Sequence, residues 1–153
     1  MQLVKNLIPD GVPCDTGKHF VDRKATNITI HYTGPLPNQT PEEVRNYWIK
    51  SKGEASAHYI IKDDECLQCW ENDKVAWHTG TKAGNHCSIG IEVIPEDKQG
   101  KFSEKSIQTL KELLEQLPHL PIVRHYDWNT KKCPAYYVID SRWKALLEQI
   151  KPE

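Results

Sequence analysis

Apolar residues alternate with polar ones, or run together, in several short segments separated by turn residues, which is typical of β-strands. Segment 27–33 (NITIHYT) alternates in this way and is stopped by Gly34 and Pro35. Two apolar segments further along are separated by the polar stretch 62–65, which predicts two strands joined by a turn. The pattern thus predicts strands at residues 27–33, 57–61, 66–70, 88–94 and 122–123.

A different spacing, with apolar residues every three or four positions, predicts three helices. Thr40 has the side chain of a helix N-cap and is followed by Pro41 and two glutamates, so a helix should begin there. Helices are predicted from about 41 to 52, from 103 to 117 and from 140 to 150. Strands and helices mixed in this order predict an α/β fold with a central mixed sheet flanked by helices. The chain length suits one domain over residues 1–153.

Charge and composition narrow the possible partners. The chain has 20 basic and 21 acidic residues and a net charge of −1, so nothing in the totals predicts nucleic-acid binding. A local basic groove for an anionic polymer remains compatible with this balance. No apolar run approaches the roughly 20 residues that a membrane-spanning helix needs, and residues 1–10 do not form a secretory signal. We therefore expect synthesis in the cytoplasm and no membrane insertion.

Five cysteines are an odd number, which argues against a complete disulfide framework. Cys66 and Cys69 form a C-x-x-C pair, a zinc or redox signal when a second pair follows, but no second pair exists. On a strand, residues three positions apart also face opposite sides of the sheet. We therefore interpret these cysteines as buried thiols.

Three residues at the ends of apolar segments have side chains that bind metals. His31 lies near the end of the first predicted strand, His125 follows the short strand 122–123 closely, and Cys133 follows a polar loop. Two imidazoles and a thiolate suit zinc and leave a fourth position for water. Residue types alone leave the alternative open, since the chain has seven histidines and Cys133, before Pro134, could serve only packing.

Six short sequence blocks, three of which contain these residues, are spread along nearly the whole chain. They are 30–33 (IHYT), 56–59 (SAHY), 76–80 (AWHTG), 88–92 (SIGIE), 124–127 (RHYD) and 131–134 (KKCP). In this order they resemble the type 2 N-acetylmuramoyl-L-alanine amidases, zinc enzymes that share their fold with peptidoglycan recognition proteins. The resemblance implies that fold and one Zn²⁺ ion, bound by His31, His125 and Cys133.

The residue type at the third ligand position also indicates which kind of family member this chain resembles. Cytosolic wall-recycling members of the family have Asp there, whereas the thiolate is the form found in phage endolysins and catalytic recognition proteins. The resemblance therefore implies an endolysin-like or autolysin-like enzyme, which cuts the amide between N-acetylmuramic acid and L-alanine in bacterial peptidoglycan. We expect it to act as a monomer at the bacterial cell wall after release from the cytoplasm.

Further roles follow from the same resemblance. Glu92 matches the glutamate that moves protons in family members, Lys131 the lysine that stabilises the oxyanion, and Tyr59 a tyrosine that orients water or carbonyl. The alternation of residues along this strand also allows Glu92 to face solvent, because the apolar residues beside it could form the core face. His58 points away from Tyr59 on a strand and is expected to be structural.

The expected substrate groove is less specific. Asp127 is a candidate to hold a ligand imidazole in one tautomer, as carboxylates near metal sites often do. Groove residues are predicted at Trp77, His78, Thr79, Trp128 and Asn129.

Three alternatives remain at this point. One is a wall-binding module without activity, although such modules usually lack the cysteine ligand. A second is a recycling amidase that acts on soluble muropeptides in the cytosol. The third is a structural zinc domain, for which His78 or His86 would supply the fourth ligand.

Overall fold

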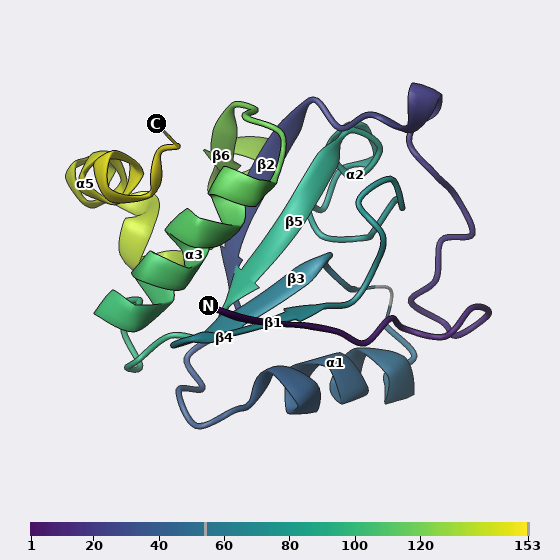
Figure 1. Cartoon of the computed structure of the whole chain (residues 1–153), viewed down its shortest axis with the longest axis horizontal. Helices are drawn as coiled ribbons and strands as arrows, with labels where there is room; N and C mark the ends of the chain where they lie inside the picture. Colours follow the sequence, from purple (N-terminus) through teal and green to yellow (C-terminus); the bar gives the residue numbers. More distant parts are fainter. Residues whose placement is uncertain (54, 153) are drawn as a thin grey trace.

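The computed structural model describes residues 1–53 and 55–152, and its centre is a twisted six-stranded sheet with helices on both faces (Figure 1). The strand order is β1-β4-β3-β5-β2-β6; β3 and β4 are antiparallel, and the other neighbouring strands are parallel. The strands are β1 (Gln2–Lys5), β2 (Asn27–Tyr32), β3 (Tyr59–Lys62), β4 (Glu65–Gln68), β5 (Ser88–Val93) and β6 (Ile122–Arg124). This confirms the α/β class.

Among the described residues, three helices are ten or more residues long, and the other two have four and five residues. The helices are α1 (Pro41–Lys50), α2 (Lys82–Asn85), α3 (Glu104–Gln116), α4 (His125–Asn129) and α5 (Asp140–Ile150), with 3-10 turns η1 (Val21–Arg23) and η2 (Ala135–Val138). Helix α1 covers one face of the sheet, while α3 and α5 cover the other (Figure 1). In the part of the chain that the structure describes, no helix is both long and apolar enough to cross a membrane.

The two faces of the sheet bury different sets of side chains, because successive residues of a strand point to opposite sides. On the α3–α5 face, Ile30 and Ile91 pack with Leu113 and with Trp143. On the α1 face, Ile60 packs with helix residues, including Trp48 and Val44, in a second apolar cluster. His31 and Glu92 are paired across β2 and β5 in register, so both point to the α1 face.

Most predicted elements are present, with boundaries that move by a few residues. Thr40 caps α1 as expected: its hydroxyl accepts from the Glu43 amide, and the Glu43 carboxylate accepts from the Thr40 amide. Strand β1 was not predicted, because its four residues are all exposed at the sheet edge and show no alternation of buried positions. Helices α2 and α4 were also missed, since four and five residues are too few for helical periodicity.

The cysteines agree with the interpretation as free thiols. All five are free. Cys66 and Cys69 are buried in the two different apolar clusters, on opposite faces of the sheet. Burial raises the pKa of both thiols to about 12, so both remain protonated and unreactive near neutral pH.

His58 is buried, and both of its ring nitrogens have hydrogen-bond partners. Its Nε2 donates to the Lys74 carbonyl at 2.6 Å, and its Nδ1 accepts from the Gly90 amide at 3.0 Å. Burial lowers its pKa from 6.5 to about 4, so the folded protein holds this imidazole neutral. This arrangement fits the structural role expected for His58.

We predict that His58 makes the folded protein acid-sensitive. Between pH 6.5 and pH 4 the unfolded chain binds a proton here that the folded chain does not, so stability falls as pH falls. At 1.36 kcal/mol per pKa unit, His58 alone should lower the free energy of unfolding by about 2 kcal/mol between pH 7 and pH 5. Urea unfolding at the two pH values should show a smaller loss in His58→Gln than in the original chain. Equal losses in both proteins would contradict this assignment.

Candidate metal centre

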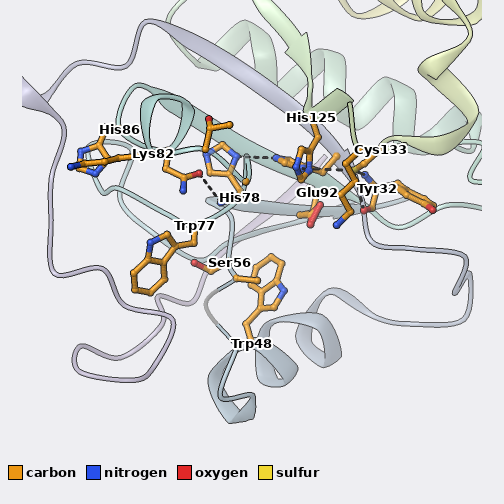
Figure 2. Close-up of a pocket in the computed structure, with 16 residues that line it drawn as sticks. Tyr32, Trp48, Ser56, Trp77, His78, Lys82, His86, Glu92, His125 and Cys133 are labelled. Atoms are coloured by element: carbon orange, nitrogen blue, oxygen red, sulfur yellow. Dashed lines mark hydrogen bonds between the residues drawn. The ribbon is translucent and has the colours of Figure 1, made fainter. Parts of the chain in front are cut away.

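A cleft of about 480 Å³ opens on the α1 side of the sheet. Figure 2 shows His125 and Cys133 with Glu92 at one end, and Lys82 with His86 at the other. The indoles of Trp48 and Trp77 line the part between them (Figure 2). The cleft therefore joins a group of metal-binding side chains to a longer surface that mixes aromatic and polar groups.

The structure brings the three predicted ligands together. His31 comes from β2, His125 opens α4 directly after β6, and Cys133 follows α4. Because β2 and β6 are neighbouring parallel strands, their carboxyl ends meet at one edge of the sheet. His31 Nδ1 lies 3.0 Å from His125 Nδ1 and 3.8 Å from Cys133 Sγ, and all three residues are buried.

These separations and chemical types fit one zinc ion. Two nitrogens bound tetrahedrally at about 2.0–2.1 Å are about 3.3 Å apart, and a sulfur ligand adds a few tenths of an ångström. All three ligand atoms lie within 4.8 Å of one another. The donor set of two imidazoles and one thiol leaves a fourth position open toward the cleft, as in catalytic rather than structural zinc sites.

The protonation states favour metal binding by the imidazoles. Burial lowers the pKa of His31 well below its usual value and that of His125 to about 4, so both are neutral and have a free lone pair. Burial raises the pKa of the Cys133 thiol to about 12, so its thiolate would need a bound cation. The Tyr32 amide points at Cys133 Sγ from 3.4 Å and would stabilise that anion.

Glu92 lies next to this cluster with an incomplete set of hydrogen bonds. Its Oε2 is buried and has no hydrogen-bond partner among the described residues. Burial raises the pKa of this carboxyl to about 8, against the opposing charge of Lys131. The neighbouring Ile91 and Val93 do form the core face, but the opposite face at Glu92 is the cleft and not bulk solvent. A carboxylate so placed can exchange a proton with a molecule bound beside it.

Lys131 also lines the cleft, on the exposed loop that leads to Cys133. It shares this lining with Glu92 and His125. Its positive charge opposes the rise that burial causes in the pKa of Glu92 and adds to the fall that burial causes in the pKa of His125. A cation here can stabilise negative charge that develops on a substrate oxygen.

Tyr59 does not line the cleft, in contrast to the prediction from the sequence. It pairs with Ile91 in register across β3 and β5, and so points to the α3–α5 face of the sheet. There it is 3% exposed, and its hydroxyl donates to Asn72 Oδ1. Alternation had placed His58 and Tyr59 on opposite sides, but the register with β5 decides which side faces the metal-binding cluster.

Among the predicted groove residues, only Trp77 and His78 line the cleft. Trp77 presents a partly exposed indole, whereas the His78 ring is buried, with partners at both nitrogens. Thr79 is fully buried, and its hydroxyl donates to Asn85 Oδ1 at 2.9 Å. Thr79 therefore holds the loop in shape and does not face a ligand.

The two predicted groove residues of α4 also lie outside the cleft lining. The Trp128 indole donates to Thr29 Oγ1 at 3.0 Å, which anchors α4 on β2. The Asn129 side chain accepts from the Lys131 amide at 3.1 Å. Its amide also packs so closely on Gly80 that a Cβ there would lie 2.2 Å from Asn129 Nδ2. Both side chains therefore shape the loop between two candidate ligands.

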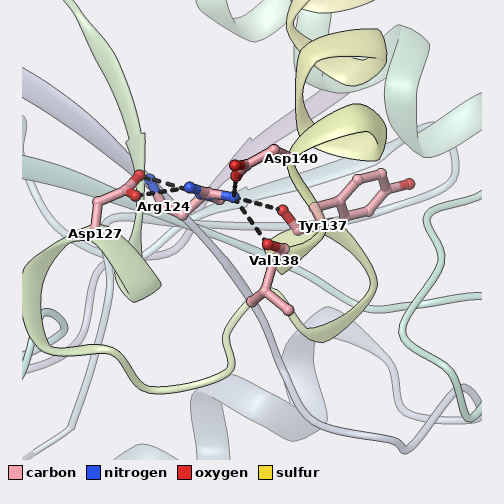
Figure 3. A network of polar contacts seen from close by, with 5 residues as sticks. All are labelled: Arg124, Asp127, Tyr137, Val138 and Asp140. Atoms are coloured by element: carbon pink, nitrogen blue, oxygen red, sulfur yellow. Dashed lines mark hydrogen bonds and ion pairs between the residues drawn. The ribbon is translucent and has the colours of Figure 1, made fainter.

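Asp127 binds an arginine and not an imidazole, so the prediction that it holds a ligand tautomer is wrong. Its carboxylate accepts from the Arg124 amide at 2.8 Å and from Arg124 Nη2 at 2.9 Å. Arg124 also donates to the carbonyls of Tyr137 and Val138 and pairs with Asp140 (Figure 3). This network fastens the start of α4, and with it His125, to η2 and α5.

The sequence did not indicate several cleft residues. Trp48 fits the apolar face of a helix, and nothing in its spacing marks it as part of a cleft. Lys82 and His86 are close in sequence to the AWHTG block, and that proximity was the available signal; the sequence had suggested His86 only as the fourth ligand of a structural zinc domain. Tyr32 and Ser56 also line the cleft.

Comparisons with known proteins agree with this geometry. A family model described as N-acetylmuramoyl-L-alanine amidase matches residues 21–136. N-acetylmuramoyl-L-alanine amidase CwlA of Bacillus subtilis (strain 168) is 30% identical, covering 100% of this chain and 58% of the relative. N-acetylmuramoyl-L-alanine amidase CwlL of Bacillus licheniformis is 32% identical, covering 92% of this chain and 44% of the relative. The chain thus spans about half the length of these curated relatives.

The fold also matches solved structures. The structure of PlyL aligns with a TM-score of 0.79 at 24% identity, covering 99% of this chain and 98% of PlyL. Fold and site together define an α/β domain in which a candidate metal-binding cluster lies beside an open cleft. The family match across most of the chain is specific: the chain belongs to the N-acetylmuramoyl-L-alanine amidase family.

Proposed function

We propose that this chain is a zinc-dependent amidase that hydrolyses the amide between N-acetylmuramic acid and L-alanine in bacterial peptidoglycan. The observation that carries the proposal is the cluster of His31, His125 and Cys133 beside the unpartnered carboxylate of Glu92, in a chain of this family. A module that only bound the wall would have no chemical need for these groups.

Zinc bound at this site would polarise the scissile carbonyl and lower the pKa of a bound water to about 7. The positive charges of Lys131 and of a bound zinc ion would favour the ionised form of Glu92. As a carboxylate, Glu92 accepts the proton from the attacking water and returns it to the leaving nitrogen of L-alanine as the carbon–nitrogen bond breaks. Lys131 stabilises the negative charge on the carbonyl oxygen of the tetrahedral intermediate. Buried and neutral, His31 and His125 hold their lone pairs in place for the ion without needing to lose a proton.

The rest of the cleft supports a glycan-peptide substrate. Trp77 offers an indole face on which a sugar or peptide plane can pack, and the neighbouring Lys82 and His86 supply polar contacts. The thiolate ligand at Cys133 favours a wall-lysing enzyme, an endolysin or autolysin, over a recycling amidase. We propose that it acts on the wall as a monomer, without membrane insertion or nucleic-acid binding.

We further propose that residues 1–153 work as one catalytic domain. Both apolar clusters lie on a single sheet, and the cleft draws its lining from elements along most of the chain. A structural zinc domain is less well supported. His78 has both ring nitrogens engaged, and His86 lies at the far end of the cleft (Figure 2).

The proposal predicts metal-dependent wall lysis. Purified bacterial walls should lose turbidity with the zinc-loaded protein, and removal of the metal by a strong chelator should reduce the rate to background. Added Zn²⁺ should restore it. Bound zinc without lysis of any wall type would rule out the lytic activity, and lysis unaffected by chelation would rule out the metal mechanism.

A further inference from the structure

The ring of His78 lies directly behind His31, on the side away from the other two candidate ligands. His78 Nδ1 is 2.9 Å from His31 Nε2, and His78 Nε2 is 2.9 Å from the carbonyl oxygen of Ser88 (Figure 2 shows His78 beside the metal-binding end). His31 Nδ1, the remaining ring nitrogen, faces His125 and Cys133. The contacts form a line from a backbone carbonyl to a metal-binding nitrogen.

The direction of these hydrogen bonds follows from their chemistry. The Ser88 carbonyl can only accept, so His78 Nε2 must donate to it. An imidazolium in this buried position would need an anionic partner, but the partners of the His78 ring are a carbonyl and an imidazole. A neutral His78 that donates through Nε2 must accept at Nδ1, so His31 Nε2 carries the proton and His31 Nδ1 carries none.

The surrounding chain is shaped around the His78 ring. Gly90 lies so close that a Cβ at this position would be 2.6 Å from His78 Nδ1 and 2.8 Å from its Cγ. Asn85 Oδ1 accepts from the amides of His78 and Thr79, at 3.1 and 2.8 Å, and fixes the backbone that carries the ring. The ring also meets His58 edge-on, with centroids 5.9 Å apart. The ring is therefore held in one orientation.

We propose that His78 is a positioning residue that fixes His31 in the tautomer with a proton on Nε2, and so keeps Nδ1 free for the metal. This proposal rests on the zinc site of the proposed function. It gives His78 a different role from the substrate contact expected from the sequence. Partners that orient a metal-binding histidine typically contribute about 10–100-fold to metal affinity.

The first test observes the tautomer itself in the metal-free protein. The protein is labelled with ¹⁵N-histidine, and two-dimensional NMR spectra correlate each ring nitrogen with the carbon-bound protons of the same ring. These spectra distinguish protonated from unprotonated ring nitrogens. We expect His31 to show a protonated Nε2 and an unprotonated Nδ1 in the original chain. In His78→Leu, which removes the acceptor, His31 should show a mixture of tautomers. A protonated Nδ1 in the original chain would overturn the proposal, whether or not the variant folds.

The second test measures zinc affinity by competition with a coloured chelator. His78→Leu should bind zinc about 10–100-fold more weakly, while His78→Asn, whose Oδ1 can replace Nδ1 as acceptor, should retain most of the affinity. His119→Leu, which removes an exposed imidazole outside the cleft, should bind zinc normally. Unchanged affinity and tautomer in His78→Leu would refute the role of His78. If the original chain bound no zinc, the proposed function would fail instead, and the tautomer measurement would still decide the role of His78.

Discussion

Replacing Cys133 with serine should remove zinc binding and wall lysis together. The change deletes the one thiolate of the cluster and leaves a hydroxyl, which is a poor zinc ligand at neutral pH. Loss of a residue that only orients a ligand costs about 10–100-fold in metal affinity, so loss of a direct ligand should cost more. Zinc content after dialysis and the rate of turbidity loss measure the two effects.

A matched control uses another free cysteine. Cys87 is partly exposed, and its thiol donates to the Ala83 carbonyl, outside the metal-binding cluster. Cys87→Ser should therefore retain zinc and lysis. If Cys133→Ser bound one zinc per chain as tightly as the original protein, Cys133 would not be a ligand.

The second large effect is expected for Glu92→Gln, which should keep zinc but lose turnover. The amide has nearly the same shape as the carboxylate, yet it cannot take a proton from water at neutral pH. Loss of a general base typically costs about 10²–10⁴-fold in rate, and kcat on a soluble muramyl-peptide substrate would show it. Zinc content should remain unchanged.

Glu96→Gln supplies the comparison, because this glutamate is exposed and lies just beyond β5 on the same segment of chain. The Glu96→Gln variant should have the same turnover as the original chain. Turnover in Glu92→Gln within a few-fold of normal would mean that another group moves the proton.

The elements of the fold could be predicted where a strand or helix was long enough to show its own period. Strand β2 and helix α3 are examples, since the alternation in segment 27–33 and the apolar spacing in segment 103–117 predicted both elements. Strand β1 could not be predicted, because its identity depends on pairing with β4, more than sixty positions away. Pairing between distant segments leaves no periodic signal in a short exposed strand.

The site shows the same division between local and long-range information. The metal-binding cluster followed from residue types and from the order of family blocks, and the structure brings its members together. Tyr59 was assigned to the cleft, but the register of β3 against β5 turns it to the α3–α5 face of the sheet. The contact of His78 with His31 joins residues 47 positions apart, and the sequence placed His78 only in a groove.

Asp127 illustrates a third limit. A carboxylate two residues after a candidate ligand is a reasonable partner for an imidazole, and the sequence supports that interpretation. In the structure it caps its own helix and binds Arg124, whose guanidinium also reaches Tyr137 and Asp140 (Figure 3). Local hydrogen bonding at the start of α4 therefore takes precedence over the more distant metal site.

Mass spectrometry of digested peptidoglycan tests the central claim most directly. An amidase of the proposed specificity releases free stem peptides that begin with L-alanine and leaves the glycan strands intact. We expect these products from the zinc-loaded protein and none from Glu92→Gln. New reducing sugar ends, or cuts within the stem peptide, would contradict the assignment of the reaction.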